Sequence, residues 1–221
     1  LGKDPDHGPL AQGFDVNIGG NQSGAPKSYF SPYNNPDLAD GPNGEYLTDR
    51  LTDEAIHFIN ENSNISFFLY LTHYAVHTPL QATEELVRKY CNKKGDIFHN
   101  NPLYAAMIES ADKGIGKILD LLDDLSLTQN TIIIFTSDNG GHGRITSMAP
   151  LRGSKGMLYE GGIRVPLIIK WPDKVNAGIK CDEPVITIDL YPTILEMTGC
   201  ALPAHKIVDG KRLVPLFTQS D

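Results

Sequence analysis

The sequence predicts an α/β fold in which a mostly parallel sheet is flanked by helices. Three short apolar runs, at residues 67–71, 131–136 and 166–171, have the length and composition of strands buried on both faces. Segments with helical periodicity separate and follow these runs, and this alternation is typical of a parallel sheet. With 221 residues, the chain is long enough to bury one sizeable core.

The first 50 residues are rich in Gly, Pro, Asn and Asp, and they predict an irregular, loop-dominated segment. A loop of this length in a compact domain is usually functional or packed over other parts of the protein. Thr52 is the expected N-cap of the first helix, because Asp53 and Glu54 in the next turn suit the helix dipole. We therefore expect one domain, with loops over residues 1–50 and an α/β core portion over 51–221.

Two further helices are predicted beside the apolar runs. Apolar residues recur at helical spacing between residues 104 and 125, with acidic residues between them. The other helix begins near Ile188 and Asp189, carries Pro192 in its first turn and ends at Gly199. Ligands in α/β folds gather at the carboxyl ends of strands, so site residues are expected just after the apolar runs.

Charge and composition argue against some classes of function. The formal net charge of −8 argues against a nucleic-acid partner, because a phosphate backbone requires clustered Lys and Arg. No stretch approaches the ~20 apolar residues of a membrane span. The three cysteines, Cys91, Cys181 and Cys200, lack metal-site spacing. We expect them to be small apolar fillers, with at least one free thiol.

The run at 131–136 leads directly into Ser137-Asp138-Asn139-Gly140-Gly141-His142. Asp138 and Asn139 therefore lie at the carboxyl end of a predicted strand, and the glycines after them allow a sharp turn. A carboxylate beside an amide oxygen suits a hard cation such as Ca²⁺ or Mg²⁺. The alternative is a simple turn, which Asp-Asn-Gly favours without any metal.

A second cluster combines cations with glycines and contains Arg152, Lys155 and Arg164. Such a loop can cradle a tetrahedral oxyanion, with Lys as a point charge and Arg as a planar fork. The alternative is that both arginines are structural partners of nearby carboxylates, Glu160 or Asp138.

A third cluster follows the run at 67–71, where His73 and His77 precede Pro79. A His at the carboxyl end of a strand can donate to a substrate oxygen or act as a general acid. The alternative is a surface or core His that only satisfies local hydrogen bonds.

In their order along the chain, these clusters resemble the sulfatase family, within the alkaline-phosphatase-like superfamily of α/β hydrolases. The resemblance spans nearly the whole chain, and an ordered series of blocks is more specific than one motif. The block Pro150-Leu151-Arg152-Gly153-Ser154-Lys155-Gly156 with residues 159–166 is the most recognisable. The other matching blocks are 13–15, 40–53, 67–80, 136–141, 189–195 and 209–210.

The resemblance implies roles for individual residues. Asp138 and Asn139 would ligate an active-site Ca²⁺, with Mg²⁺ the less expected ion. Lys155 would contact the substrate sulfate, and His77 would bind or protonate near the leaving-group oxygen. His142, beside the metal loop, is a candidate for contact with the substrate. The resemblance gives His73 and the two arginines only supporting roles.

The chain also departs from the family pattern. The family nucleophile is a Cys or Ser in a Cys/Ser-x-Pro-x-Arg motif, oxidised to formylglycine, and no such motif occurs here. The family's first acidic metal-ligand pair is absent too. The chain opens at Leu1-Gly2, just after the position of a family block with a catalytic Lys and His. We therefore expect a fragment, with a fold incomplete at its N-terminal side and no activity in isolation.

The function expected of the full-length protein is hydrolysis of sulfate esters, with sulfated glycans as the expected substrates. One alternative is a phosphatase or phosphodiesterase of the same superfamily, which attacks with Thr or Ser and usually holds two zinc ions. The other is a non-catalytic, anion-binding fragment. The sequence does not fix the location, and the resemblance leaves the periplasm, the extracellular space and the lysosome open.

Overall fold

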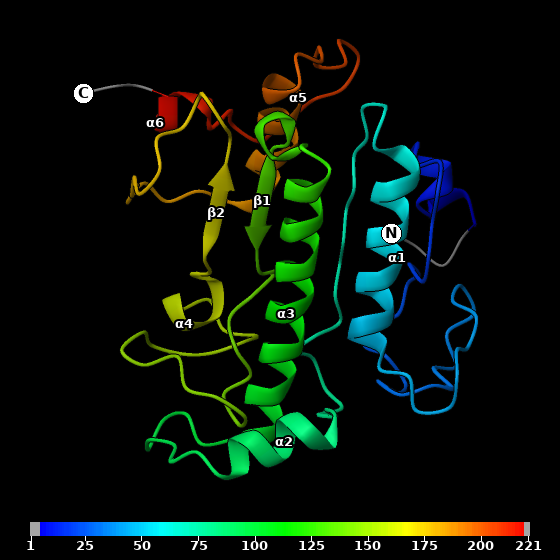
Figure 1. Ribbon diagram of the computed structural model, residues 1–221. Coiled ribbons are helices and arrows are strands. Elements are labelled where there is room, and N and C mark those ends of the chain that lie inside the picture. The colour runs from blue at the N-terminus through cyan, green and yellow to red at the C-terminus, as the bar shows by residue number, and fades with distance from the viewer. Residues whose placement is uncertain (1–4, 219–221) are drawn as a thin grey trace. The chain divides into compact units, whose positions relative to one another are not determined.

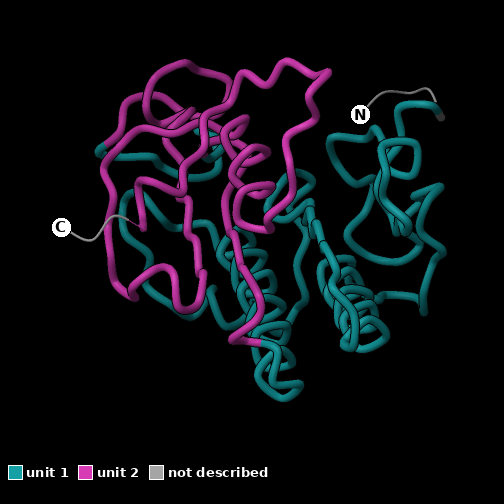
Figure 2. The backbone as a smooth tube through the Cα atoms, turned by 90° about the horizontal axis from the view of Figure 1, so that it is seen from above, with its two compact units in different colours: residues 1–127, 141–150 teal, residues 128–140, 151–221 magenta. Residues whose placement is uncertain are grey.

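The structure is a computed structural model that describes residues 5–218 and divides into two compact units (Figure 2). The first unit comprises Leu1–Leu127 with Gly141–Pro150, and the second comprises Thr128–Gly140 with Leu151–Asp221. Each unit carries part of the residues that the sequence singles out.

Three helices dominate the first unit, namely α1 (Leu47–Asn62), α2 (Glu84–Cys91) and α3 (Pro102–Asp124). Helix α3 packs against both α1 and α2 (Figure 1). Its start is fixed by Asn101, whose side chain accepts a hydrogen bond from the Tyr104 N–H at 3.1 Å. The helix predicted over 104–125 is therefore confirmed, whereas α2 was not predicted.

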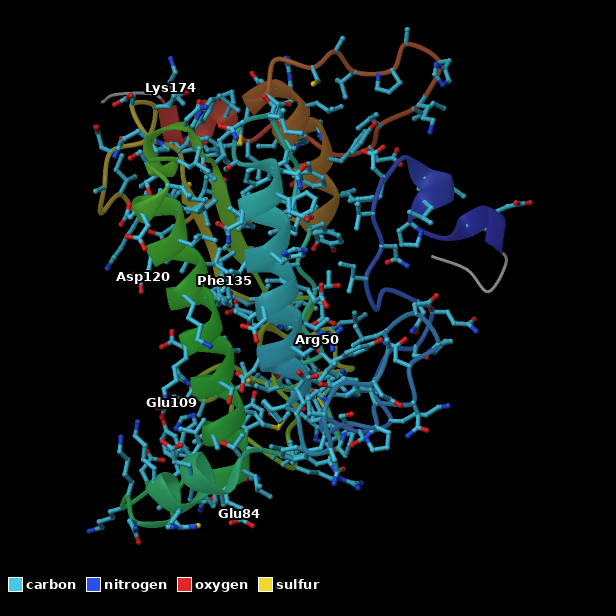
Figure 3. All side chains as sticks on the ribbon, turned by 45° about the vertical axis from the view of Figure 1, so that its right-hand side comes forward. Arg50, Glu84, Glu109, Asp120, Phe135 and Lys174 are labelled. Atoms are coloured by element: carbon cyan, nitrogen blue, oxygen red, sulfur yellow. The ribbon has the colours of Figure 1, made fainter. Side chains whose placement is uncertain are left out.

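Ion pairs reinforce the ends of these helices. Lys89 of α2 lies 2.7 Å from the Glu109 carboxylate of α3, where Figure 3 labels Glu109. Arg50 of α1 pairs with Glu45 at 3.2 Å and with Glu54 at 2.8 Å. These contacts join α2 to α3, and they join the loop that precedes α1 to the first turns of that helix.

Helix α1 begins earlier than the sequence predicted. Thr52 lies inside the helix, fully buried, and its hydroxyl donates to the Thr48 carbonyl at 2.9 Å. The expectation that Thr52 is the N-cap was wrong, because burial of Leu47 and Leu51 extends the helix toward its N-terminus. Thr52 also packs so closely on Gly114 of α3 that a Cβ there would overlap its hydroxyl.

The segment before α1 is irregular, as predicted, with two short 3₁₀ turns at Pro5–His7 and Leu10–Gln12. It nevertheless supplies much of the core of the first unit. The buried cluster comprises Tyr29, Tyr33, Leu38, Tyr46, Leu47, Leu51 and Met107. The loop is therefore a packed part of the unit rather than an exposed excursion.

The apolar run at 67–71 pairs with no strand among residues 5–218. Its burial alternates: Phe67 is half-buried against Phe58, with ring centroids 5.7 Å apart, whereas Phe68 and Tyr70 are 56% and 67% exposed. A period of two is the pattern of an extended segment covered on one face. The prediction of a strand buried on both faces was therefore wrong for this run.

The second unit contains a two-stranded sheet of β1 (Ile133–Thr136) and β2 (Leu167–Lys170). These strands confirm two predicted runs, and the combination with helices confirms the α/β class. Their pairing is antiparallel, with Phe135 opposite Ile168, so the expectation of a parallel arrangement was wrong for this pair. The connection contains only the short helix α4 (Glu160–Ile163) rather than a crossover helix of the usual length.

The second unit ends with the 3₁₀ turn η4 (Thr187–Asp189), α5 (Leu190–Met197) and α6 (Val214–Thr218). As predicted, Pro192 lies in the first turn of α5 and Gly199 follows its end, with a φ of 71°. The buried Asp189 carboxylate accepts hydrogen bonds from the N–H groups of Ile186 at 3.0 Å and Lys211 at 2.7 Å.

Two further expectations can be compared with the described residues. Across residues 5–218, no helix combines the length and apolar character that crossing a membrane requires. The three cysteines, Cys91, Cys181 and Cys200, are free thiols and all are exposed. The expectation that they are small apolar fillers was wrong, because Cys91 lies at the end of α2 and Cys181 and Cys200 lie in exposed loops.

Candidate functional site

The loop after β1 carries the predicted metal ligands. The Ser137 hydroxyl donates to the Asn139 carbonyl at 2.9 Å, which closes a tight turn directly after the strand. Asp138 is exposed and Asn139 is half-buried, and no hydrogen bond or ion pair engages the Asp138 carboxylate within the described chain. Both side-chain oxygens are therefore available to a cation.

This loop is joined to the glycine-rich loop by backbone contacts. The Gly140 N–H donates to the Gly162 carbonyl at 2.9 Å, and the Gly161 N–H donates to the Arg152 carbonyl at 2.7 Å. A Cβ at Gly140 would overlap the Gly161 carbonyl oxygen, and a Cβ at Gly161 would overlap that of Gly153. Only glycine permits this approach, which places the loop of Lys155 against the loop of Asp138.

The two arginines of the glycine-rich loop are engaged in structural contacts. Arg164 lies 3.0 Å from the Glu160 carboxylate, one helical turn away. The Arg152 guanidinium stacks on the Tyr159 ring, 3.9 Å from its centroid. Lys155 is half-buried, and its ammonium has no ion-pair partner among the residues described. It is therefore the cation of this loop best placed to meet an anion.

His77, in the first unit, is held so that one ring nitrogen stays open. Its backbone N–H donates to the Tyr74 carbonyl at 2.7 Å, and its ring nitrogen Nδ1 lies 2.9 Å from the Thr78 carbonyl oxygen. A carbonyl oxygen can only accept, so Nδ1 carries a hydrogen. Nε2 has no partner within residues 5–218, which leaves it free for proton transfer.

His73 has a different environment, although it lies four residues before His77. Both of its ring nitrogens are buried without a hydrogen-bond partner among the described residues. Burial lowers the pKa of His73, because the interior disfavours the charged imidazolium. This neutral, enclosed ring does not have the open nitrogen that substrate contact requires.

His142 is exposed and caps its own turn. Its Nδ1 accepts from the Arg144 N–H at 3.2 Å, and its carbonyl accepts from the Ile145 N–H at 2.8 Å. An accepting Nδ1 implies a hydrogen on Nε2 in the neutral ring, so the exposed edge of His142 is a hydrogen-bond donor.

Asp138, Asn139 and Lys155 belong to the second unit, whereas His77 and His142 belong to the first unit. Within the described residues, no three His, Cys, Asp or Glu side chains form a metal-binding group. The oxygen donors of Asp138 and Asn139 suit a hard cation but supply two ligands, whereas Ca²⁺ takes about 6–8.

The sequence did not predict the role of Tyr159, whose ring stacks with the Arg152 guanidinium. Its position in the glycine-rich block was the only signal for that contact.

Known proteins resemble this chain across nearly all of its length. The Sulfatase family profile matches residues 3–200. Steryl-sulfatase of Homo sapiens is 36% identical over 204 residues, which cover 86% of this chain and 33% of that protein. A sulfatase of Formosa agariphila is 38% identical over 200 residues, which cover 84% of this chain and 36% of that protein. The chain thus spans about a third of the length of these relatives.

A solved structure extends the similarity to three dimensions. The crystal structure of Ps i-CgsB in complex with k-i-k-neocarrahexaose superimposes with a TM-score of 0.82 and 33% sequence identity. The match covers 97% of this chain and 52% of that one.

Proposed function

The chain belongs to the sulfatase family, and from that membership we propose that the full-length protein hydrolyses sulfate esters. The observation that carries the proposal is the hydrogen bond from Gly140 to Gly162, because it joins the loop of Asp138 and Asn139 to the loop of Lys155. An oxygen-donor pair and an unpaired cation, on two segments that a backbone hydrogen bond joins, suit a divalent cation and a sulfate.

We propose that Asp138 and Asn139 contribute oxygen ligands to Ca²⁺. The metal would supply positive charge that stabilises the sulfate oxygens in the transition state. Lys155 would donate to another sulfate oxygen and offset its charge. Because two ligands cannot complete a calcium shell, the remaining ligands are proposed to come from residues outside this chain.

His77 is proposed as the proton donor to the leaving group. With Nδ1–H held by the Thr78 carbonyl, the protonated ring directs Nε2–H outward. As the S–O ester bond breaks, that proton would pass to the departing alcohol oxygen, and the ring would become neutral. A formylglycine outside this chain would supply the nucleophile, because no Cys/Ser-x-Pro-x-Arg motif occurs in these 221 residues.

Sulfated glycans are the proposed substrates. The support is the similarity to Ps i-CgsB, which was crystallised with a neocarrahexaose. Steryl sulfates are the competing class, because human steryl-sulfatase is a relative of comparable identity. His142 is proposed to donate to the substrate from its exposed edge.

The test compares the full-length protein with the isolated chain. With Ca²⁺, the full-length protein should release sulfate from an aryl sulfate at ~1 s⁻¹ or faster, and act more slowly on the matching aryl phosphate. The isolated chain should show no turnover, since loss of a covalent nucleophile removes many orders of magnitude of rate. Faster release of phosphate than of sulfate would instead favour a phosphatase.

Substrate class is tested on the same protein with a sulfated oligosaccharide and a steryl sulfate. We expect a higher kcat/KM for the oligosaccharide. A preference for the steryl sulfate would overturn the glycan assignment and leave the sulfatase assignment intact.

A further inference from the structure

Two buried tyrosines hold the turn that carries His77. The Tyr29 hydroxyl donates to the His77 carbonyl at 3.0 Å, and the Tyr46 hydroxyl donates to the Gln81 carbonyl at 2.8 Å. In return, the Gln81 side-chain oxygen accepts from the Tyr29 N–H at 2.7 Å. These three hydrogen bonds link residues 48, 35 and 52 positions apart, so the loop before α1 reaches across to fix residues 77–81.

The tyrosines are themselves firmly placed. Tyr29 is 0% and Tyr46 is 3% exposed, and their rings stack with centroids 5.9 Å apart. The Tyr29 carbonyl accepts from the Leu47 N–H at 2.8 Å, which anchors it to the first residue of α1. Burial raises the pKa of Tyr46 to about 12 and that of Tyr29 further, so both hydroxyls remain donors at working pH.

These contacts leave His77 with a single open polar atom. Its carbonyl is held by Tyr29, its N–H by Tyr74 and its Nδ1 by Thr78. Nε2 alone lacks a partner in the described part of the chain. A fixed backbone, a fixed tautomer and one open nitrogen are what directional proton transfer requires.

We propose that Tyr29 is a positioning residue for His77, aiming Nε2 at the leaving-group oxygen through its hydrogen bond to the His77 carbonyl. The inference rests on the proposed function, in which His77 protonates the departing alcohol. If Tyr29 were only a core residue, its ring would matter and its hydroxyl would not.

The experiment uses the full-length protein and two aryl sulfates that differ in their need for a proton. Nitrophenyl sulfate has a leaving group that departs readily as an anion, whereas unsubstituted phenyl sulfate depends on a general acid. Tyr29→Phe keeps the ring and removes only the hydroxyl. We expect kcat for phenyl sulfate to fall about 10- to 100-fold, with KM and the rate on nitrophenyl sulfate changed less than about threefold.

Tyr33→Phe is the matched control. Tyr33 is a buried tyrosine of the same core, 1% exposed, and its hydroxyl donates to Glu45 at 2.6 Å rather than to the His77 turn. Tyr33→Phe should lower kcat for phenyl sulfate and for nitrophenyl sulfate by the same small factor. Equal losses on the two substrates for Tyr29→Phe would overturn the inference.

Two further variants keep the result decisive. His77→Ala should show the same dependence on the leaving group in stronger form. If His77→Ala lacks this dependence, the proposed role of His77 fails. If His77→Ala shows it and Tyr29→Phe does not, only the positioning role of Tyr29 fails.

Should Tyr29→Phe not fold, Gln81→Leu removes the hydrogen bond to the Tyr29 N–H and should give a smaller loss selective for phenyl sulfate. Equal losses for Gln81→Leu would contradict the inference.

Discussion

In the first unit, side-chain hydrogen bonds hold the turn of His77, whereas in the second unit backbone contacts hold the loops of Asp138 and Lys155. Tyr29, Tyr46 and Gln81 make the contacts around His77. Around Asp138, the corresponding contacts are hydrogen bonds and close approaches between glycines. The two regions therefore differ in what a mutation can change.

A side-chain clamp can lose one hydroxyl and keep its shape, because a phenylalanine fills the space of a tyrosine. The close approaches of Gly140 and Gly161 allow no comparable conservative substitution. Any Cβ at these positions would overlap a backbone carbonyl oxygen, which cannot shift without moving the chain around it. The His77 turn should accordingly be adjustable by mutation, and the glycine-rich loop should tolerate almost nothing.

Gly161→Ala should have the largest effect of the variants that test this difference between the two regions. The added methyl group would overlap the Gly153 carbonyl, so we expect the free energy of unfolding to fall by about 3 kcal/mol in urea titrations. Gly116→Ala is the control, because a Cβ at Gly116 would meet no atom within 4 Å and alanine favours the interior of α3. Equal stability of the two variants would contradict the proposed tightness of the loop.

In the first unit, His73, whose ring nitrogens are buried, should make the free energy of unfolding depend on pH. Its pKa is lowered in the folded state, so the unfolded chain binds more protons below the ordinary value of 6.5. Stability should be intact above that pH and decrease as pH falls below it, by at most about 1.4 kcal/mol per pH unit.

His73→Phe should remove this slope from the pH dependence of unfolding in urea. His57→Gln, at an exposed position beside Glu61, serves as the control and should leave the slope in place. A slope that persists in His73→Phe would assign the pH dependence to other groups.

Arg164→Ala should have the smallest effect. The side chains of Arg164 and Glu160 are 65% and 61% exposed, and exposed ion pairs contribute about 0.5 kcal/mol or less. Arg152→Ala, which removes the stack on Tyr159, should cost about 1 kcal/mol. Thermal unfolding of the two variants measures the difference, and a larger loss for Arg164→Ala would reverse this ranking.

Local patterns in the sequence predicted the elements that depend on local interactions. The periodicity of α3 and the Pro and Gly positions around α5 identified both helices, and apolar composition identified β1 and β2. The start of α1 was missed because burial of Leu47 and Leu51 outweighed the capping signal at Thr52. The direction of β2 and whether the run at 67–71 pairs with a strand depend on distant segments, which no local pattern contains.

The same limit applies to the candidate site. Asp138, Asn139 and Lys155 could be proposed from the sequence because each follows a strand or lies in a glycine-rich block. Tyr29 was not found, since it contacts the His77 turn across 48 residues from within an irregular loop. Hydrogen bonds of that kind are set by tertiary packing alone.

Our central proposal is that Asp138, Asn139, Lys155 and His77 serve one sulfate-ester site in the full-length protein. A crystal structure of the full-length protein grown with Ca²⁺ and sulfate tests it most directly. We expect side-chain oxygens of Asp138 and Asn139 at about 2.3–2.6 Å from one Ca²⁺. Lys155 Nζ and His77 Nε2 should lie within about 3.2 Å of oxygens of the same sulfate. A sulfate bound to Lys155 with His77 on another face of the molecule, or a Ca²⁺ that does not contact Asp138, would contradict the account.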